Sequence, residues 1–184
     1  MTVFISLLRG INVGGHNKIR MEALRELYTS LGLQGAQSLL QSGNVVFASE
    51  ETDPARLSGR IADAIEKSFG FRAEVLLRTP PELRDAIARS PFADRTGLNP
   101  SLLCVTFLAG KPDEDGLAGL AKYATAGEEY SLSGRELYLY YPNGMGRSKL
   151  TNTVIERHLK TVGTARNWNT VNALLGLAEA LTAG

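Results

Sequence analysis

The spacing of apolar residues over the first 78 positions predicts alternating strands and helices. The β-forming run Thr2–Leu8, ended by a glycine, predicts a strand. Apolar residues at helical spacing then predict a helix: Met21, Leu24, Leu27, Tyr28 and Leu31. Residues 39–47 predict two strands around a tight turn, because Gly43 and Asn44 accept the positive φ that such turns need.

A second helix and a closing strand complete this first series. Asp53 and Pro54 are typical of a helix start, and apolar residues follow at steps of four: Leu57, Ile61, Ile65 and Phe69. Gly70 ends the helix, and residues 73–77 predict a strand. The resulting order, β-α-β-β-α-β, is that of the ferredoxin-like fold. We therefore expect residues 1–78 to form one ferredoxin-like half.

A short helix and a linker are expected to join this half to a second one. Thr79-Pro80-Pro81-Glu82 is a capping-box pattern, which predicts a helix that ends near Ser90. Residues 91–100 carry proline, glycine and asparagine and are typical of a linker. The region 79–100 is thus expected to lie between two halves.

The second half is expected over residues 101–184 and repeats the first series except at its end. Its predicted strands and helices are, in order, 102–108, 113–124, 130–132, 136–141 and a helix from about Ser148. The last strand is expected to be weak or missing at residues 163–167, before a final helix from about Trp168 to Leu181. The sequence therefore predicts an α+β protein of two tandem ferredoxin-like halves, the second followed by a C-terminal helix.

Composition places the chain among ordinary globular proteins, since 43% of its 184 residues are hydrophobic and 21% are charged. The single cysteine, Cys104, excludes an intrachain disulfide, and His16 and His158 match no metal-ligand spacing. No metal and no cofactor are therefore expected. The apolar N-terminus is too short to cross a membrane and lacks a basic start, so we expect a cytoplasmic protein without membrane contact.

Charge is unevenly distributed, although the net charge is only +1. Residues 79–134 hold 5 basic and 8 acidic side chains, a balance of −3. Residues 135–184 hold 6 basic and 3 acidic side chains, a balance of +3. The basic excess coincides with a glycine-rich loop, which favours a local anion-binding site there. The near-neutral net charge disfavours a protein whose whole surface binds polyanions.

Two segments of the first half are candidates for binding an anion. The connection over residues 9–18 is long and rich in glycine, and Arg9 and Lys18 bring positive charge to it. The candidate residues are Arg9, Asn12, Gly14 and Gly15 in this loop, and Ser42 and Asn44 in the turn. The structural alternative is that these residues satisfy the dihedral angles of an ordinary loop and turn.

Two further segments of the second half carry the remaining candidates. Arg147 and Lys149 lie where a helix is expected to begin, and cations are unfavourable at that end of the helix dipole unless an anion shares the site. The candidate residues are Asn143, Gly144, Arg147, Ser148, Lys149, Arg166 and Asn167. The structural alternative is that Ser148 and Asn167 cap helices.

Tyr138 and Tyr140 alternate with leucines and therefore share one face of a strand. Exposed aromatic side chains on such a sheet could stack on nucleic-acid bases. The alternative is that both tyrosines pack against other parts of the protein. The near-neutral net charge disfavours nucleic acid as a partner.

Five segments resemble the bacterial family DUF1697, a domain of unknown function. They are Leu7–Gly15 (LLRGINVGG), Leu40–Phe47 (LQSGNVVF), Tyr141–Gly144 (YPNG), Arg147–Leu150 (RSKL) and Thr164–Thr170 (TARNWNT). The resemblance extends from residue 1 to about residue 181. It implies a small α+β protein with two related, ferredoxin-like halves, and it implies no activity, cofactor or catalytic residue.

The function that these features predict is the binding of a small anionic, phosphorylated ligand at glycine-rich loops between the two halves. The alternatives are a nucleic-acid-binding module and a scaffold or interaction domain without a small ligand. No general base other than His16 is evident, so the sequence leaves open whether the protein is an enzyme. It also leaves the oligomeric state open.

Overall fold

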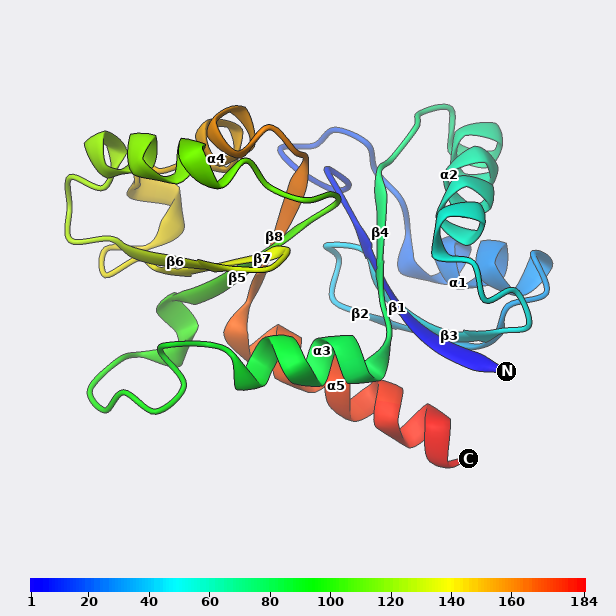
Figure 1. Ribbon diagram of the computed structural model, residues 1–184. Coiled ribbons are helices and arrows are strands. Elements are labelled where there is room, and N and C mark those ends of the chain that lie inside the picture. The colour runs from blue at the N-terminus through cyan, green and yellow to red at the C-terminus, as the bar shows by residue number, and fades with distance from the viewer. The chain divides into compact units, whose positions relative to one another are not determined.

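The computed structural model describes all residues from Met1 to Gly184 and contains two four-stranded antiparallel sheets (Figure 1). The first sheet has the order β2-β3-β1-β4. Its strands are β1 (Thr2–Leu8), β2 (Gln34–Leu39), β3 (Asn44–Ser49) and β4 (Val75–Arg78). The central strand β1 pairs with β3 on one side and β4 on the other. The predicted strands at β1, β3 and β4 are therefore confirmed with small shifts of their ends, whereas β2 lies earlier than expected and shares only Leu39 with the predicted range 39–47.

Two helices cover one face of this sheet, α1 (Met21–Ser30) and α2 (Pro54–Phe69) (Figure 1). Phe4 and Phe47 pair across β1 and β3 and stack with ring centroids 6.0 Å apart. Tyr28 of α1 meets Phe47 edge to face and shares a 2.7 Å hydrogen bond with the buried Ser6 hydroxyl. The core of this half thus lies between the sheet and the two helices.

The ends of α2 follow the local signals in the sequence. The Asp53 carboxylate accepts hydrogen bonds from the amides of Ala55 and Arg56, and Pro54 occupies the first helical position. Gly70 ends the helix with a φ of 81°, a left-handed conformation that glycine adopts without strain. Both predicted ends of α2 are therefore confirmed.

The second sheet has the order β6-β7-β5-β8. Its strands are β5 (Leu103–Leu108), β6 (Glu129–Ser133), β7 (Glu136–Tyr140) and β8 (Gly163–Asn167). The expectation that the last strand is weak or missing is wrong, because β8 pairs with β5 from Leu108↔Gly163 to Cys104↔Asn167. Its sequence carries no large apolar residue, so its strand structure comes from pairing with β5 and not from its own β-propensity.

A 3-10 helix (Glu114–Tyr123) and α4 (Asn152–Leu159) cover one face of the second sheet (Figure 1). The predicted α-helix at 113–124 is thus a 3-10 helix. A Cβ atom at Gly116 would lie 1.8 Å from the carbonyl oxygen of His158, and one at Gly119 would lie 2.5 Å from its Nδ1. The two glycines therefore allow this 3-10 helix to pack closely against α4.

The start of α4 lies later than expected. The Thr151 hydroxyl caps it by accepting a hydrogen bond from the amide of Val154, so the prediction that the helix begins near Ser148 is wrong. Ser148 instead follows a single 3-10 turn, Met145–Arg147. Thr151, three residues before Val154, is thus a local capping signal for this helix.

The remaining elements are α3 (Pro80–Ala88), a 3-10 turn (Pro100–Leu102) and α5 (Trp168–Ala183). The capping box before α3 is confirmed, since the Thr79 amide donates to Glu82 Oε2 at 2.8 Å and the Glu82 amide donates to Thr79 Oγ1 at 3.4 Å.

The contacts of the chain divide it into two compact units. One unit contains Met1–Arg84 and Ala173–Gly184, and the other contains Asp85–Asn172. The last turns of α5 therefore group with the first unit, where Leu181 lies beside Gly35. The boundaries expected from the sequence, at 78 and 101, remain predictions about how the halves fold. No helix has the length and apolar character that crossing a membrane requires.

Candidate functional site

In the first unit, Asn12 joins the loop of residues 9–20 to the turn of residues 40–43. Its Nδ2 donates to the Gln41 carbonyl at 2.7 Å and to the Ile19 carbonyl at 3.1 Å, and its Oδ1 accepts from the Ile19 amide at 2.9 Å. The residue itself has a φ of 53°, which asparagine tolerates better than most residues. Asn12 therefore fixes the position of the loop.

The glycines Gly14 and Gly15 form the tip of this loop. Their φ values are 55° and 78°, and an isolated bridge joins Val13 to His16 across them. A Cβ atom on either glycine would meet nothing closer than about 3.9 Å. The backbone conformation alone therefore requires glycine here, and both residues are exposed to solvent.

The turn of residues 40–43 packs closely against the first strand and the loop. The Gly43 carbonyl accepts a hydrogen bond from the Leu8 amide, and a Cβ at Gly43 would lie 2.5 Å from Ile11 Cδ1 and 2.8 Å from Leu8 Cβ. The buried Asn44 side chain donates to the Leu39 carbonyl at 2.7 Å and to the Ser42 hydroxyl at 2.9 Å. Ser42 and Asn44 thus have partners within the turn itself.

A groove of about 670 Å³ opens where the loop, the turn and the start of α1 meet. Its lining residues are Asn12, Gly15, Lys18, Ile19, Arg20, Met21, Glu22 and Gln41. Two predicted site residues, Asn12 and Gly15, therefore line one groove together with the loop cation Lys18. Arg9, Gly14, Ser42 and Asn44 do not line it; Arg9 is half-buried, and its amide donates to the Glu74 carbonyl.

Positive charge gathers at this groove beside the N-terminus of α1. Lys18 and Arg20 are both exposed, and Arg20 lies 3.6 Å from the Glu22 carboxylate. Arg20 is also the N-cap residue of α1, where no side chain caps the first amides. Arg20 and Gln41 were not among the predicted site residues, although the arginine directly before a predicted helix was a usable signal.

In the second unit, the predicted segment 143–149 is held by a buried carboxylate. The Ser148 hydroxyl donates to Glu128 Oε1 at 2.7 Å and accepts from the Leu150 amide at 3.0 Å. Burial alone would raise the pKa of Glu128, but hydrogen bonds from Ser148, from the Ala126 amide and from its own amide outweigh burial and lower it. Glu128 is therefore ionised at neutral pH.

The two cations of this segment, Arg147 and Lys149, do not pair with a carboxylate. Arg147 and Lys149 are exposed and make no ion pair, and both precede the Thr151 cap of α4. Asn143 donates to the Ala126 carbonyl at 3.1 Å, and Gly144 has a φ of 84°. The argument that two cations occupy the first turn of a helix therefore does not apply, and the protein's own Glu128 places an anion in this segment. No sequence pattern connected Glu128 to Ser148.

Arg166 and Asn167 lie on β8 and have structural partners. Arg166 is buried, and its Nη1 donates to Thr164 Oγ1 at 2.5 Å and to the Ala165 carbonyl at 3.0 Å. Burial lowers the pKa of Arg166 to about 10. Asn167 donates to the Ser101 carbonyl and accepts from the Asn169 amide at the start of α5, each at 2.9 Å. Arg166 is thus not a surface cation.

The two tyrosines of β7 differ in exposure. Tyr138 is buried, its hydroxyl donates to the Ala86 carbonyl, and burial raises its pKa to about 12. Tyr140 is half-buried. Tyr138 is therefore unavailable for stacking on a base, which removes the aromatic pair from the features that favoured the nucleic-acid alternative and leaves only the basic excess of residues 135–184.

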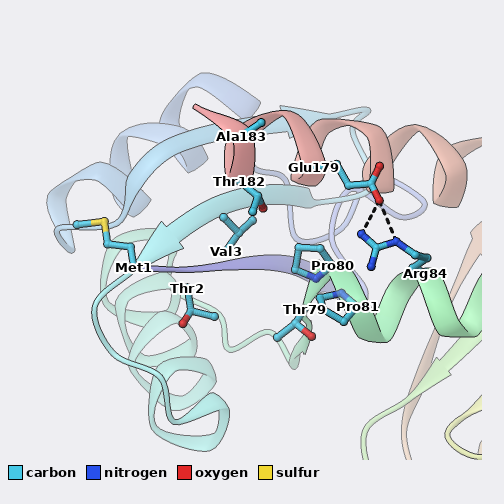
Figure 2. A pocket seen from close by; sticks show the side chains of 10 residues that line it. All are labelled: Met1, Thr2, Val3, Thr79, Pro80, Pro81, Arg84, Glu179, Thr182 and Ala183. Carbon is cyan, nitrogen blue, oxygen red and sulfur yellow. Dashed lines mark hydrogen bonds and ion pairs between the residues drawn. The ribbon is translucent and has the colours of Figure 1, made fainter.

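A second groove, of about 650 Å³, contains none of the predicted site residues (Figure 2). It lies in the first unit beside the start of β1, the first turn of α3 and the end of α5. Val3, Pro80 and Pro81 give it apolar walls, and Arg84 donates to Glu179 Oε1 from Nε at 3.1 Å and from Nη2 at 2.7 Å (Figure 2). The two charged side chains of this groove therefore pair with each other.

Comparison with known proteins identifies the family. The model of a family described as a protein of unknown function, DUF1697, matches residues 1–138. The chain belongs to the DUF1697 family. The motifs at 141–144, 147–150 and 164–170 lie beyond the matched residues of this DUF1697 protein. A search of curated proteins finds no match to the chain.

One solved structure shows the same fold as this DUF1697 protein. It is that of the conserved bacterial protein SP0830 from Streptococcus pneumoniae, with a TM-score of 0.75 and 22% sequence identity. The similarity covers 96% of this chain and 98% of that chain. It supports the mixed α+β architecture and assigns no ligand or activity.

Proposed function

We propose that this DUF1697 protein binds a small anionic, phosphorylated molecule in the groove of the first unit. The observation that carries the proposal is that Lys18 and Arg20 line the same concave surface as Asn12 and Gly15. Its volume, about 670 Å³, lies within the range of small-molecule sites, roughly 300–1,000 Å³.

The charges of the groove favour an anion. Lys18 and Arg20 bring two positive charges and Glu22 one negative charge, so the lining side chains sum to +1. The contact between Arg20 and Glu22 is exposed at 3.6 Å and therefore holds Arg20 only weakly. The uncapped first turn of α1 adds about 0.3–1 kcal/mol for an anion placed near it.

The second unit offers a weaker region for the same ligand class. Arg147 and Lys149 are exposed beside Gly144 and Asn143, while Ser148 is engaged by Glu128. The negative charge of Glu128 opposes that of an incoming anion. We therefore expect Arg147 and Lys149 to contribute less to binding than Lys18 and Arg20. No observation assigns an anion to Arg166 or Asn167.

An NMR titration with inorganic phosphate at constant ionic strength tests the proposal. The amides of Gly14, Gly15 and Gln41 should shift together and saturate. Lys18→Ala and Arg20→Ala should each weaken binding about fivefold, which corresponds to about 1 kcal/mol. The matched control is Lys67→Ala, an exposed lysine near the end of α2 in the same unit, which should leave the affinity unchanged. Unshifted amides in residues 9–20, or equal losses in the Lys18 and Lys67 variants, would contradict the proposal.

The finer fold assignment is also a proposal. The strand orders β2-β3-β1-β4 and β6-β7-β5-β8, with the element order of the first half, support two ferredoxin-like halves related by duplication. In both sheets the first strand is central and the second lies at an edge. An experimental structure that places each pair of helices on the opposite faces of its sheet would overturn this assignment.

A further inference from the structure

Two exposed apolar residues are direct chain neighbours of residues that line the anion groove. Val13 and Leu40 are 63% and 60% exposed, and they belong to a small set of large apolar residues open to solvent. Val13 follows Asn12 and Leu40 precedes Gln41, the two lining residues that a 2.7 Å hydrogen bond joins. Because consecutive Cα atoms are about 3.8 Å apart, the backbone of both apolar residues lies next to the groove.

The conformation of Leu40 is not explained by the stability of the fold. Leu40 has a φ of 61°, a left-handed conformation that is unfavourable for a branched side chain. In the neighbouring loop of residues 9–20, every residue with a positive φ is glycine or asparagine, such as Gly15 and Asn17. An exposed leucine in this conformation gains no packing energy in return for the strain, and strain of this kind is often found where a protein contacts a ligand.

We propose that the ligand of this groove carries an apolar group next to its anionic group, as an alkyl or aryl phosphate does. This inference rests on the proposed anion site. Lys18 and Arg20 attract the anionic end, and Val13 and Leu40 cover the apolar end. Covering an apolar group removes it from water, which strengthens binding about fourfold for each methylene that is buried.

The experiment compares inorganic phosphate with butyl phosphate on the intact protein. Amide shifts in the groove give both dissociation constants. Butyl phosphate should bind at least tenfold more tightly, since two buried methylenes are sufficient for that gain. Equal dissociation constants would overturn this inference and leave the anion site standing. If neither compound binds, the proposed function itself fails.

Variants at Val13 and Leu40 separate the apolar contact from folding. Leu40→Gly suits the left-handed backbone, so its melting temperature should not fall greatly. It should reduce the preference for butyl phosphate at least threefold, and Val13→Ser should act in the same direction. The matched control is Met145→Ser, an exposed apolar residue of the second unit, which should leave the preference unchanged. A preference that survives in Leu40→Gly and Val13→Ser would overturn the assignment of these residues.

A lipid headgroup could present the same chemistry at a membrane surface. Vesicles of phosphatidylglycerol and phosphatidylcholine in equal parts, tested by co-sedimentation, distinguish this source from a free molecule. Protein that binds butyl phosphate but does not sediment supports a small, free ligand. Protein that sediments with vesicles, loses this in Leu40→Gly and does not bind butyl phosphate overturns the proposal.

Discussion

The loop of residues 9–20 and the segment of residues 143–149 look alike in sequence, but their structures differ. Each combines glycines with two nearby cations ahead of a helix. In the first, the cations Lys18 and Arg20 line a groove. In the second, the carboxylate of Glu128 occupies the segment through a 2.7 Å hydrogen bond with Ser148. The difference shows that glycines and cations ahead of a helix do not by themselves determine whether a carboxylate of the protein occupies the segment.

The largest expected effect tests how closely the turn of residues 40–43 packs against the first strand and the loop. Gly43→Ala should lower the free energy of unfolding by about 3 kcal/mol, because the new Cβ would meet Ile11 and Leu8 and the backbone is left-handed. Urea unfolding measures the change. The matched control is Gly14→Ala, which is left-handed without close neighbours and should cost only about 1 kcal/mol. Equal losses in the two variants would show that the turn is not packed as described.

The next effect tests the carboxylate of the second region. Glu128→Gln should lower the free energy of unfolding by about 1–2 kcal/mol, because hydrogen bonds to a charged acceptor are replaced by neutral ones. Chemical unfolding at neutral pH measures this loss. Glu156→Gln, a half-buried glutamate on α4, serves as the comparison. A Glu128 variant as stable as the wild type would remove the proposed difference between the two regions.

The pH dependence of stability gives a second view of Glu128. Its folded-state pKa is lowered, so its contribution is present above the ordinary carboxylate pKa and is lost as pH falls through the folded value. The wild type should therefore lose more stability than Glu128→Gln between about pH 5 and pH 3. Parallel pH profiles for the two proteins would contradict the direction of this shift.

A smaller effect compares the cations of the two regions directly. Lys18→Ala should weaken phosphate binding about fivefold, whereas Arg147→Ala should change it less than about twofold, because Lys18 lines the groove and Arg147 does not. The amide-shift titration described above measures both. A larger loss in Arg147→Ala would reverse the comparison and place the anion in the second region.

The smallest effect concerns stability alone. Arg147→Ala and Lys149→Ala should each change the free energy of unfolding by less than about 0.5 kcal/mol, because both side chains are exposed and make no ion pair. Thermal and chemical unfolding check this. A larger loss would mean that these cations stabilise the loop, as Glu128 does.

Much of the fold could be predicted because its signals are local. The β-forming run of β1, the aspartate and proline at the start of α2 and the capping box before α3 each lie within a few residues of the element they define. The strand β8 could not be predicted in this way, because its five residues depend on pairing with β5, about 60 positions earlier. The 3-10 helix of Glu114–Tyr123 likewise depends on the close approach of α4 at two glycines.

The sequence by itself determined the two similar series of elements, the glycine-rich loops and the presence of cations in them. It also drew attention to Asn12, Gly15 and Lys18, which the structure brings to one groove. Tertiary structure alone decided that Gln41 joins this groove, that Arg166 is buried, and that Glu128 meets Ser148 across 20 positions. Local sequence fixes dihedral preferences and charge, whereas the partner of each polar group depends on which distant segments the packed core brings into contact.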